Sequence, residues 1–78
     1  MPMAYVLITT EARAVDNVLK SMKKNAAFEE VYKVYGIYDI LATVKAENMD
    51  KLTEIVTGNL RSLDQVKSTL TMIVAEES

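Results

Sequence analysis

Two kinds of hydrophobic periodicity alternate along this chain, and their order is the strongest constraint on its fold. Apolar residues at helical spacing predict one helix that ends near Asn25 and a second that runs from Asn48 to about Ser62. Alternating, β-branched runs predict four strands, over residues 3–10, 28–35, 38–46 and 66–75. The predicted order is therefore strand, helix, strand, strand, helix, strand, in which one strand–helix–strand unit is used twice.

Residues that favour caps and turns mark the ends of these elements. Thr10 is the predicted N-cap of the first helix and Asn48 that of the second, because their side-chain oxygens can accept hydrogen bonds from first-turn N–H groups. Gly36 separates the two central runs and predicts a hairpin between them. Right-handed crossovers then give a four-stranded antiparallel sheet of order 4-1-3-2 with both helices on one face. This arrangement is a ferredoxin-like βαββαβ sandwich of the α+β class.

One face of the predicted sheet has no helix to cover it. A chain of 78 residues has room for a single core, so we expect residues 1–78 to form one domain. Small domains of this kind often gain stability from subunit contacts. If the helices cover the aliphatic side of the strands, the uncovered face carries Tyr5, Leu7, Leu41, Thr69, Thr71 and Ile73. We expect two copies to stack these faces as a dimeric α+β barrel, with pockets at its rim.

The composition restricts the chemistry that the chain can perform. It holds no Cys and no His, which excludes a disulfide, a thiol nucleophile, an imidazole acid–base group and an ordinary zinc site. Nine Lys and Arg residues against 11 Asp and Glu give a net charge of −2, so a broad phosphate-binding face is missing. Apolar runs fall far short of the roughly 20 residues of a membrane span. We therefore expect a cytoplasmic protein with no catalytic residue, metal, cofactor, direct DNA binding or membrane contact.

The central segment from Glu30 to Val44, EVYKVYGIYDILATV, resembles the C-terminal effector domain, or RAM domain, of the Lrp/AsnC (feast/famine) transcriptional regulators. The segments LTEIV from Leu52 and VKSTLTMIV from Val66 resemble that family's second helix and closing strand. The most diagnostic piece is Gly-x-Tyr-Asp at residues 36–39, followed by an apolar strand. The resemblance covers nearly the whole chain.

The resemblance implies a regulatory module rather than an enzyme. Members of the family bind a free amino acid at the interface between dimers and assemble into forms up to octamers that control transcription. These 78 residues lack the helix-turn-helix domain of full-length members, so we expect the chain to sense an amino acid or to co-assemble with a full-length Lrp/AsnC regulator, rather than to read DNA itself. The implied ligand-binding residues lie in the hairpin and in the last strand: Tyr35, Gly36, Ile37, Tyr38, Asp39, Ser68, Thr69 and Thr71.

Several of these residues have a plain structural interpretation as well. Gly36 serves a tight turn, and its turn also leaves backbone N–H groups open to a ligand carboxylate. Asp39 accepts turn hydrogen bonds or acts as counter-ion for a ligand ammonium group. We expect Tyr32 to pack at an interface and Tyr35 and Tyr38 to form pocket walls.

Other proteins of the same topology give three alternative functions. A small dimeric ferredoxin-like barrel enzyme would bind substrate between sheet and helices, and only Asp39 and the tyrosines offer it reactive groups. An ACT domain would carry a glycine in the turn after its first strand, where this chain has Thr9-Thr10-Glu11-Ala12. An RNA-recognition module would need stacking aromatics and a basic sheet face.

Overall fold

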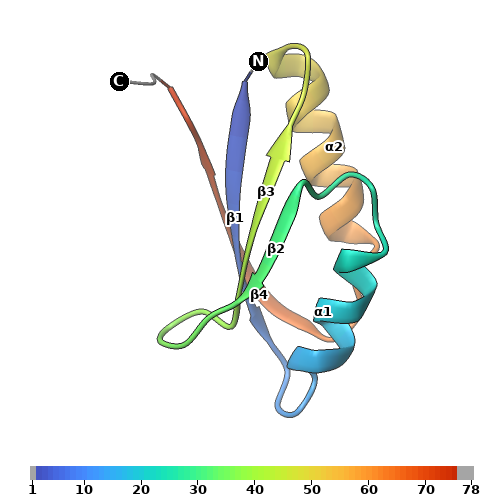
Figure 1. Cartoon of the computed structure of the whole chain (residues 1–78), viewed down its shortest axis with the longest axis vertical. Helices are drawn as coiled ribbons and strands as arrows, with labels where there is room; N and C mark the ends of the chain where they lie inside the picture. Colours follow the sequence, from blue (N-terminus) through green and yellow to red (C-terminus); the bar gives the residue numbers. More distant parts are fainter. Residues whose placement is uncertain (1, 76–78) are drawn as a thin grey trace.

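The computed structural model describes residues 2–75 and places both helices on one side of a four-stranded sheet (Figure 1). The elements are β1 (Met3–Thr10), α1 (Val15–Lys23), β2 (Glu30–Lys33), β3 (Ile40–Lys45), α2 (Met49–Arg61) and β4 (Val66–Ile73). The strand order is β2-β3-β1-β4, and all neighbouring strands are antiparallel. The predicted ferredoxin-like βαββαβ fold and its sheet order are thereby confirmed.

The two predicted helix caps have different outcomes. Asn48 caps α2 as predicted, since its side-chain oxygen accepts a hydrogen bond of 2.9 Å from the Lys51 N–H. The prediction that Thr10 caps α1 is wrong. The helix begins later, at Val15, and Ala14 occupies the N-cap position without a side-chain hydrogen bond. Thr10 instead remains the last residue of β1, where its N–H is used by a different part of the chain.

The second and third strands along the chain, β2 and β3, are shorter than the sequence predicted. β2 ends at Lys33 and β3 begins at Ile40, so residues 34–39 form a six-residue loop instead of a tight hairpin. The loop is closed at its base, where the Val34 N–H donates to the carbonyl of Asp39 at 2.9 Å. Apolar residues continue through the loop in the sequence, and periodicity therefore overestimated the length of both strands. β4 likewise ends at Ile73, two residues before the predicted end.

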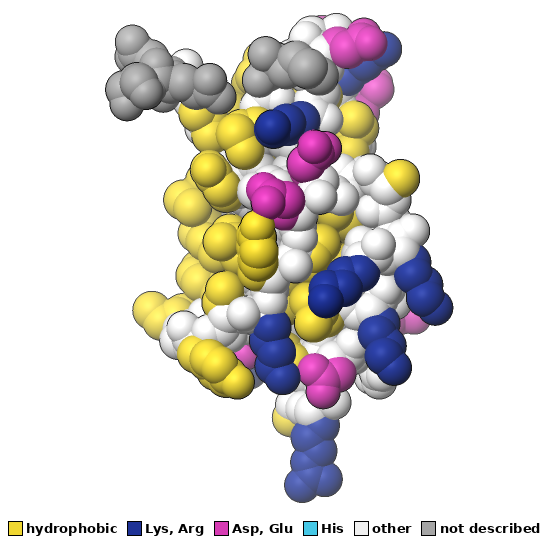
Figure 2. Space-filling model, viewed as in Figure 1, with side chains coloured by type: hydrophobic (Ala, Val, Ile, Leu, Met, Phe, Trp, Pro, Cys, Tyr) yellow, Lys and Arg dark blue, Asp and Glu magenta, His cyan; other side chains and the backbone are white. Residues whose placement is uncertain are grey.

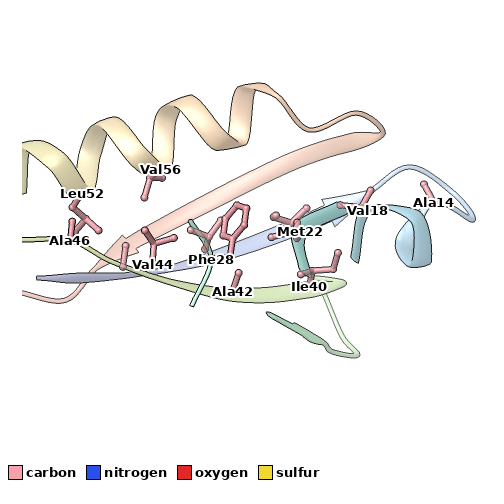
Figure 3. Close-up of a cluster of buried hydrophobic side chains, with 13 residues drawn as sticks. Ala14, Val18, Met22, Phe28, Ile40, Ala42, Val44, Ala46, Leu52 and Val56 are labelled. Carbon is pink, nitrogen blue, oxygen red and sulfur yellow. The ribbon is translucent and has the colours of Figure 1, made fainter. Parts of the chain in front are cut away.

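The core lies between the sheet and the two helices. The helix-facing residues of β1 and β3 are fully buried, and α1 and α2 each place buried apolar side chains against them (Figure 3). Burying one such aliphatic side chain contributes about 1.5–3 kcal/mol. The residues of this core are Ala4, Val6, Ile8, Ala14, Val18, Met22, Phe28, Ile40, Ala42, Val44, Ala46, Leu52 and Val56.

The register of β4 differs from the one that the sequence suggested. It pairs three buried residues of β1 with three of β4: Ala4 with Ile73, Val6 with Thr71, and Ile8 with Thr69. Paired residues point to the same face of a sheet. Thr69, Thr71 and Ile73 therefore lie on the helix side, and their predicted place on the uncovered face is wrong.

A bulge explains the error. Thr9 pairs with Ser68 but Thr10 pairs with Val66, so Lys67 is an extra residue on β4. The extra residue reverses the inward and outward sides of the strand, because side chains alternate with a period of two. Val66 consequently packs against the core, while the residues of the same parity beyond the bulge face away from the helices. These residues are Ser68, Leu70 and Met72.

Candidate functional site

The loop between β2 and β3, residues 34–39, projects from the end of the sheet on the side away from the helices (Figure 1). It is tied to the sheet by Asp39, whose N–H donates to the carbonyl of Ile8 at 2.9 Å. The four backbone N–H groups of residues 35–38 have no hydrogen-bond partner within residues 2–75. A run of free N–H groups in a short loop can bind an anion such as a carboxylate.

Gly36 is required by the backbone rather than by close packing. Its φ is +132°, a conformation that residues with a side chain rarely adopt, and a Cβ added there would meet nothing within 4 Å. Open space therefore surrounds the middle of the loop. The structure supports the turn interpretation of this glycine and also leaves its N–H accessible.

Asp39 uses one carboxylate oxygen to hold the end of β1. Its Oδ2 accepts a hydrogen bond of 2.9 Å from the Thr10 N–H and one of 3.3 Å from the Thr10 hydroxyl. Within residues 2–75, no hydrogen bond reaches its Oδ1. The side chain is half-buried. Asp39 is thus a structural hydrogen-bond acceptor through one oxygen, but its donor lies on the neighbouring strand β1 and not in the turn, as the structural interpretation had expected. The other oxygen remains available to a cation.

Two large apolar side chains at the tip of the loop are almost fully exposed. Tyr35 keeps 93% of its surface accessible and Ile37 keeps 86%, whereas Tyr38 is half-buried. Such exposure on a projecting segment is typical of surfaces that contact another molecule. Tyr35 and Ile37 therefore do not form a pocket wall within a single copy of the chain.

The three predicted ligand residues of β4 are separated by the structure. Ser68 faces away from the helices and pairs with Thr9, at the same end of the sheet as loop 34–39. Thr69 and Thr71 face the helices instead, and Thr71 pairs with Val6 further along the strand. One copy of the chain thus brings together the five predicted residues of the loop, but it does not add Thr71 to them.

Thr71 lines a groove between α2 and the edge strand β4. The groove has a volume of about 210 Å³. None of its lining side chains titrates, so it offers hydroxyl groups but no acid or base. The lining residues are Leu52, Thr53, Val56, Thr57, Thr71 and Ile73.

The sheet face opposite the helices carries an apolar row that crosses all four strands; we call this face the open face. Cross-strand pairing aligns one row of residues, Tyr32, Leu41, Leu7 and Leu70. The neighbouring row is Glu30, Thr43, Tyr5 and Met72. Hydrophobic side chains gather over this face on the left of Figure 2. Sequence reasoning assigned Tyr5, Leu7 and Leu41 to this face and missed Leu70 and Met72, because the only signal for them is the bulge at Lys67.

A polar pair borders the open face on β2. The Tyr32 hydroxyl donates a hydrogen bond of 2.6 Å to Glu30 Oε2. This hydrogen bond and the negative charge of Glu30 raise the pKa of the Tyr32 phenol above its ordinary value. The ring of Tyr32 therefore presents its apolar body to the open face while its hydroxyl is engaged at the rim.

Comparison with known proteins assigns the chain to a family. Residues 3–78 match the Lrp/AsnC ligand binding domain. The chain belongs to this family. The predicted resemblance, which rested on the Gly-x-Tyr-Asp loop and the closing strand, is confirmed. The loop just described is therefore part of a domain whose relatives include transcriptional regulators.

Relatives of this Lrp/AsnC domain differ in length. The HTH-type transcriptional regulator FL11 of Pyrococcus furiosus is 29% identical over 72 residues, which are 92% of this chain and 47% of FL11. The chain thus spans about half the length of that curated relative. TTHA0845 from Thermus thermophilus is 29% identical with a TM-score of 0.89, over 100% of this chain and 98% of that one.

A third relative was solved with a bound amino acid. The transcriptional regulator NMB0573 of Neisseria meningitidis, in a complex with L-Met, shares the fold at a TM-score of 0.78. It is 17% identical, and the match covers 97% of this chain and 51% of that one. At this identity the likeness establishes the common fold.

Two further properties of the Lrp/AsnC domain concern residues 2–75. No helix in this range is long and apolar enough to cross a membrane. The same range contains no group of three Asp or Glu side chains placed to hold a metal ion.

Proposed function

We propose that this Lrp/AsnC domain is a regulatory module that binds a free amino acid between copies of the chain and thereby changes its assembly. One observation carries the proposal: loop 34–39 combines four backbone N–H groups with Oδ1 of Asp39, and none of these has a hydrogen-bond partner within residues 2–75. A free amino acid carries a carboxylate and an ammonium group on one carbon. The loop N–H groups are suited to bind the carboxylate, and Asp39 is suited to bind the ammonium group.

The binding site is completed by a neighbouring copy in this proposal. Tyr35 and Ile37 are too exposed to enclose a ligand within one chain. Ser68, Thr69 and Thr71 of a neighbouring copy would supply the hydroxyl groups that one copy does not bring to the loop. Binding at such a junction favours the assembled form, since a ligand shifts an equilibrium toward the state that it binds better.

The open face is the proposed dimer interface. Stable interfaces bury about 800 Å² on each partner and have an apolar centre with a polar rim. The open face has this character, with leucines in its middle and the Tyr32–Glu30 pair at its edge. Two such faces stacked around a two-fold axis form the dimeric α+β barrel, and further contacts through loop 34–39 would extend dimers toward the octamers expected from the family resemblance.

A full-length Lrp/AsnC regulator is the proposed cellular partner. The same open face would pair with the matching domain of such a regulator, and the amino acid would then control a mixed assembly. DNA contact is assigned to the partner, because the net charge of this chain is −2.

An enzymatic function has no supporting site in the described residues. The barrel-enzyme alternative needs space between sheet and helices, and thirteen buried residues fill that region. The groove beside α2 contains hydroxyl groups without a general acid or base. A non-catalytic role is therefore part of the proposal.

A thermal-shift panel of the twenty common amino acids, read beside light scattering, tests the proposed function. An amino acid at 100 times its Kd stabilises the folded form by about 2.7 kcal/mol, which raises the Tm of so small a domain by roughly 10 °C or more. We expect one chemical class to raise Tm and increase the mass. A panel in which no amino acid changes Tm or mass would contradict the proposal.

A further inference from the structure

We propose that Thr10 is a positioning residue for the amino-acid site. By holding Oδ2 of Asp39, it anchors loop 34–39 and directs Oδ1 to the ligand. The ligand part of this inference rests on the proposed function. The anchoring itself is a property of the free chain and can be measured without any ligand.

The contact between Thr10 and Asp39 is double. The Thr10 N–H and the Thr10 hydroxyl both donate to the same oxygen, at 2.9 Å and 3.3 Å. Two donors that come from one residue fix the orientation of a carboxylate better than a single donor does. Thr10 is itself buried at 8% exposure, so its hydroxyl cannot turn freely to water. Within residues 2–75 the carboxylate is therefore held through Oδ2 alone, and its second oxygen has no hydrogen-bond partner.

The end of the β1–β3 ladder makes Thr10 available for this contact. The pairing of β1 with β3 ends at Ile8 and Ile40, so the Thr10 N–H lies beyond the last pair of that ladder. On the other side, the register shift places Thr10 opposite Val66. The carboxylate of Asp39 takes the place that a backbone carbonyl would occupy in a longer ladder. The last residue of β1 thus provides an anchor for the loop where the β1–β3 ladder has ended.

The anchor also connects the two predicted parts of the ligand site. Asp39 is joined to β1 by its own N–H, which donates to Ile8, and by the two bonds from Thr10. The next residue, Glu11, donates its N–H to the carbonyl of Gln65 at 2.8 Å, just before β4 begins. Thr10 therefore lies between loop 34–39 and the strand that carries Ser68. Loss of its hydroxyl should loosen the loop without disturbing the core.

Three variants separate anchoring from general destabilisation. Thr10→Val removes the hydroxyl and keeps both the shape of the side chain and the N–H bond. Thr10→Ser keeps the hydroxyl and serves as the rescue variant. Val56→Ala, in α2, is the matched control, because it removes two methyl groups from the core far from loop 34–39 in the fold.

The first measurement uses the free chain. Backbone NMR relaxation and amide hydrogen exchange are recorded for residues 35–38 and for Thr10 in all variants. We expect Thr10→Val to increase the mobility of residues 35–38 and to accelerate exchange of the residue-10 amide, while Thr10→Ser and Val56→Ala leave both as in the wild type. A loop that is equally ordered in Thr10→Val and in the wild type would overturn the inference, whatever the chain binds.

The second measurement is calorimetric titration with each of the twenty common amino acids. For those that bind the wild type, Thr10→Val should raise Kd about two- to tenfold, the range of one hydrogen bond, and Thr10→Ser should restore most of the affinity. An unchanged Kd in Thr10→Val, or an equal loss in Val56→Ala, would overturn the positioning role. If no amino acid binds the wild type, the proposed function fails, and the loop measurements still decide whether Thr10 anchors the loop.

Discussion

Leu70 offers the sharpest test of the open face as a dimer interface. It lies at the β4 end of the row that crosses all four strands, and 44% of its surface is exposed in one copy. Ile73 lies on the same strand with 43% exposed, but it faces the helix side. The two residues are therefore matched in hydrophobicity and exposure and differ in the face that they occupy.

The expected effect of Leu70→Ala follows from this exposure. Full burial of a leucine side chain is worth about 1.5–3 kcal/mol, so covering the exposed 44% contributes about 0.7–1.3 kcal/mol in each copy. A two-fold dimer contains the residue twice, which gives about 1.3–2.6 kcal/mol. The dimer Kd should rise about 10- to 80-fold. The single copy should also lose some stability, because the rest of the Leu70 surface is buried within its own chain; Ile73→Ala, at 43% exposed, controls for this loss.

A dilution series followed by sedimentation equilibrium measures both Kd values. We expect Leu70→Ala to dissociate at concentrations where the wild type and Ile73→Ala remain dimeric. The reverse order, in which Ile73→Ala weakens the dimer and Leu70→Ala does not, would refute the assignment of the open face. That outcome would favour the helix side of β4 as the contact surface.

Three further predictions concern single features of the fold. Gly36→Ala should lower the free energy of unfolding in urea by about 1–3 kcal/mol, because the φ of residue 36 is +132°. Gly58→Ala, inside α2 and with open space around it, should raise that free energy by about 0.5–1 kcal/mol. A change in the same direction for both variants would contradict this prediction. Asn48→Ala should lower the free energy of unfolding by about 1 kcal/mol, because the hydrogen bond from the Lys51 N–H to the Asn48 side chain is lost. An unchanged urea midpoint would show that Asn48 does not stabilise α2 as a cap. Glu30→Gln should lower the pKa of Tyr32 in an ultraviolet tyrosinate titration. Because the pKa of Tyr32 is raised in the folded state, the Tyr32–Glu30 pair contributes its full stability below the unfolded-state pKa of the tyrosine. This stability is lost as the pH rises through the folded-state pKa, so a stability effect of Glu30→Gln that is confined to acid pH would contradict the prediction.

Most of the fold could be predicted from the sequence, because the local signals for helices and strands agree with the overall strand arrangement. β1 has its predicted bounds, and α2 begins after its predicted cap and ends within one residue of the predicted place. Each of these elements carries one periodicity and a recognisable end. The strand order followed from the repeat of one strand–helix–strand unit and the handedness of its crossovers.

The faces of β4 were not predictable in the same way. This strand has apolar residues on both sides of the bulge and on both faces, so the alternation that identifies a buried side is absent. Lys67 gives no sign in the sequence that it is the extra residue. The assignment of Thr69, Thr71 and Ile73 to the uncovered face was therefore wrong, although the strand itself was predicted.

The candidate site was predictable as a segment but not as a geometry. The Gly-x-Tyr-Asp pattern located loop 34–39. The structure adds that the N–H groups of residues 35–38 have no partner in the described part of the chain and that the tip of the loop is exposed. The partner of Asp39 is Thr10, which lies 29 residues away in the sequence and which the capping rule had assigned to α1. A contact of this separation depends on strand register, which local patterns do not encode.

The most direct test of the central claim is an NMR titration of backbone amides with the amino acid that gives the largest thermal shift. If loop 34–39 binds the amino acid, we expect saturable shifts at residues 35–38 and at Asp39, with an affinity that matches the thermal data. Shifts confined to the groove beside α2, at Leu52 and Thr71, with an unperturbed loop would contradict it.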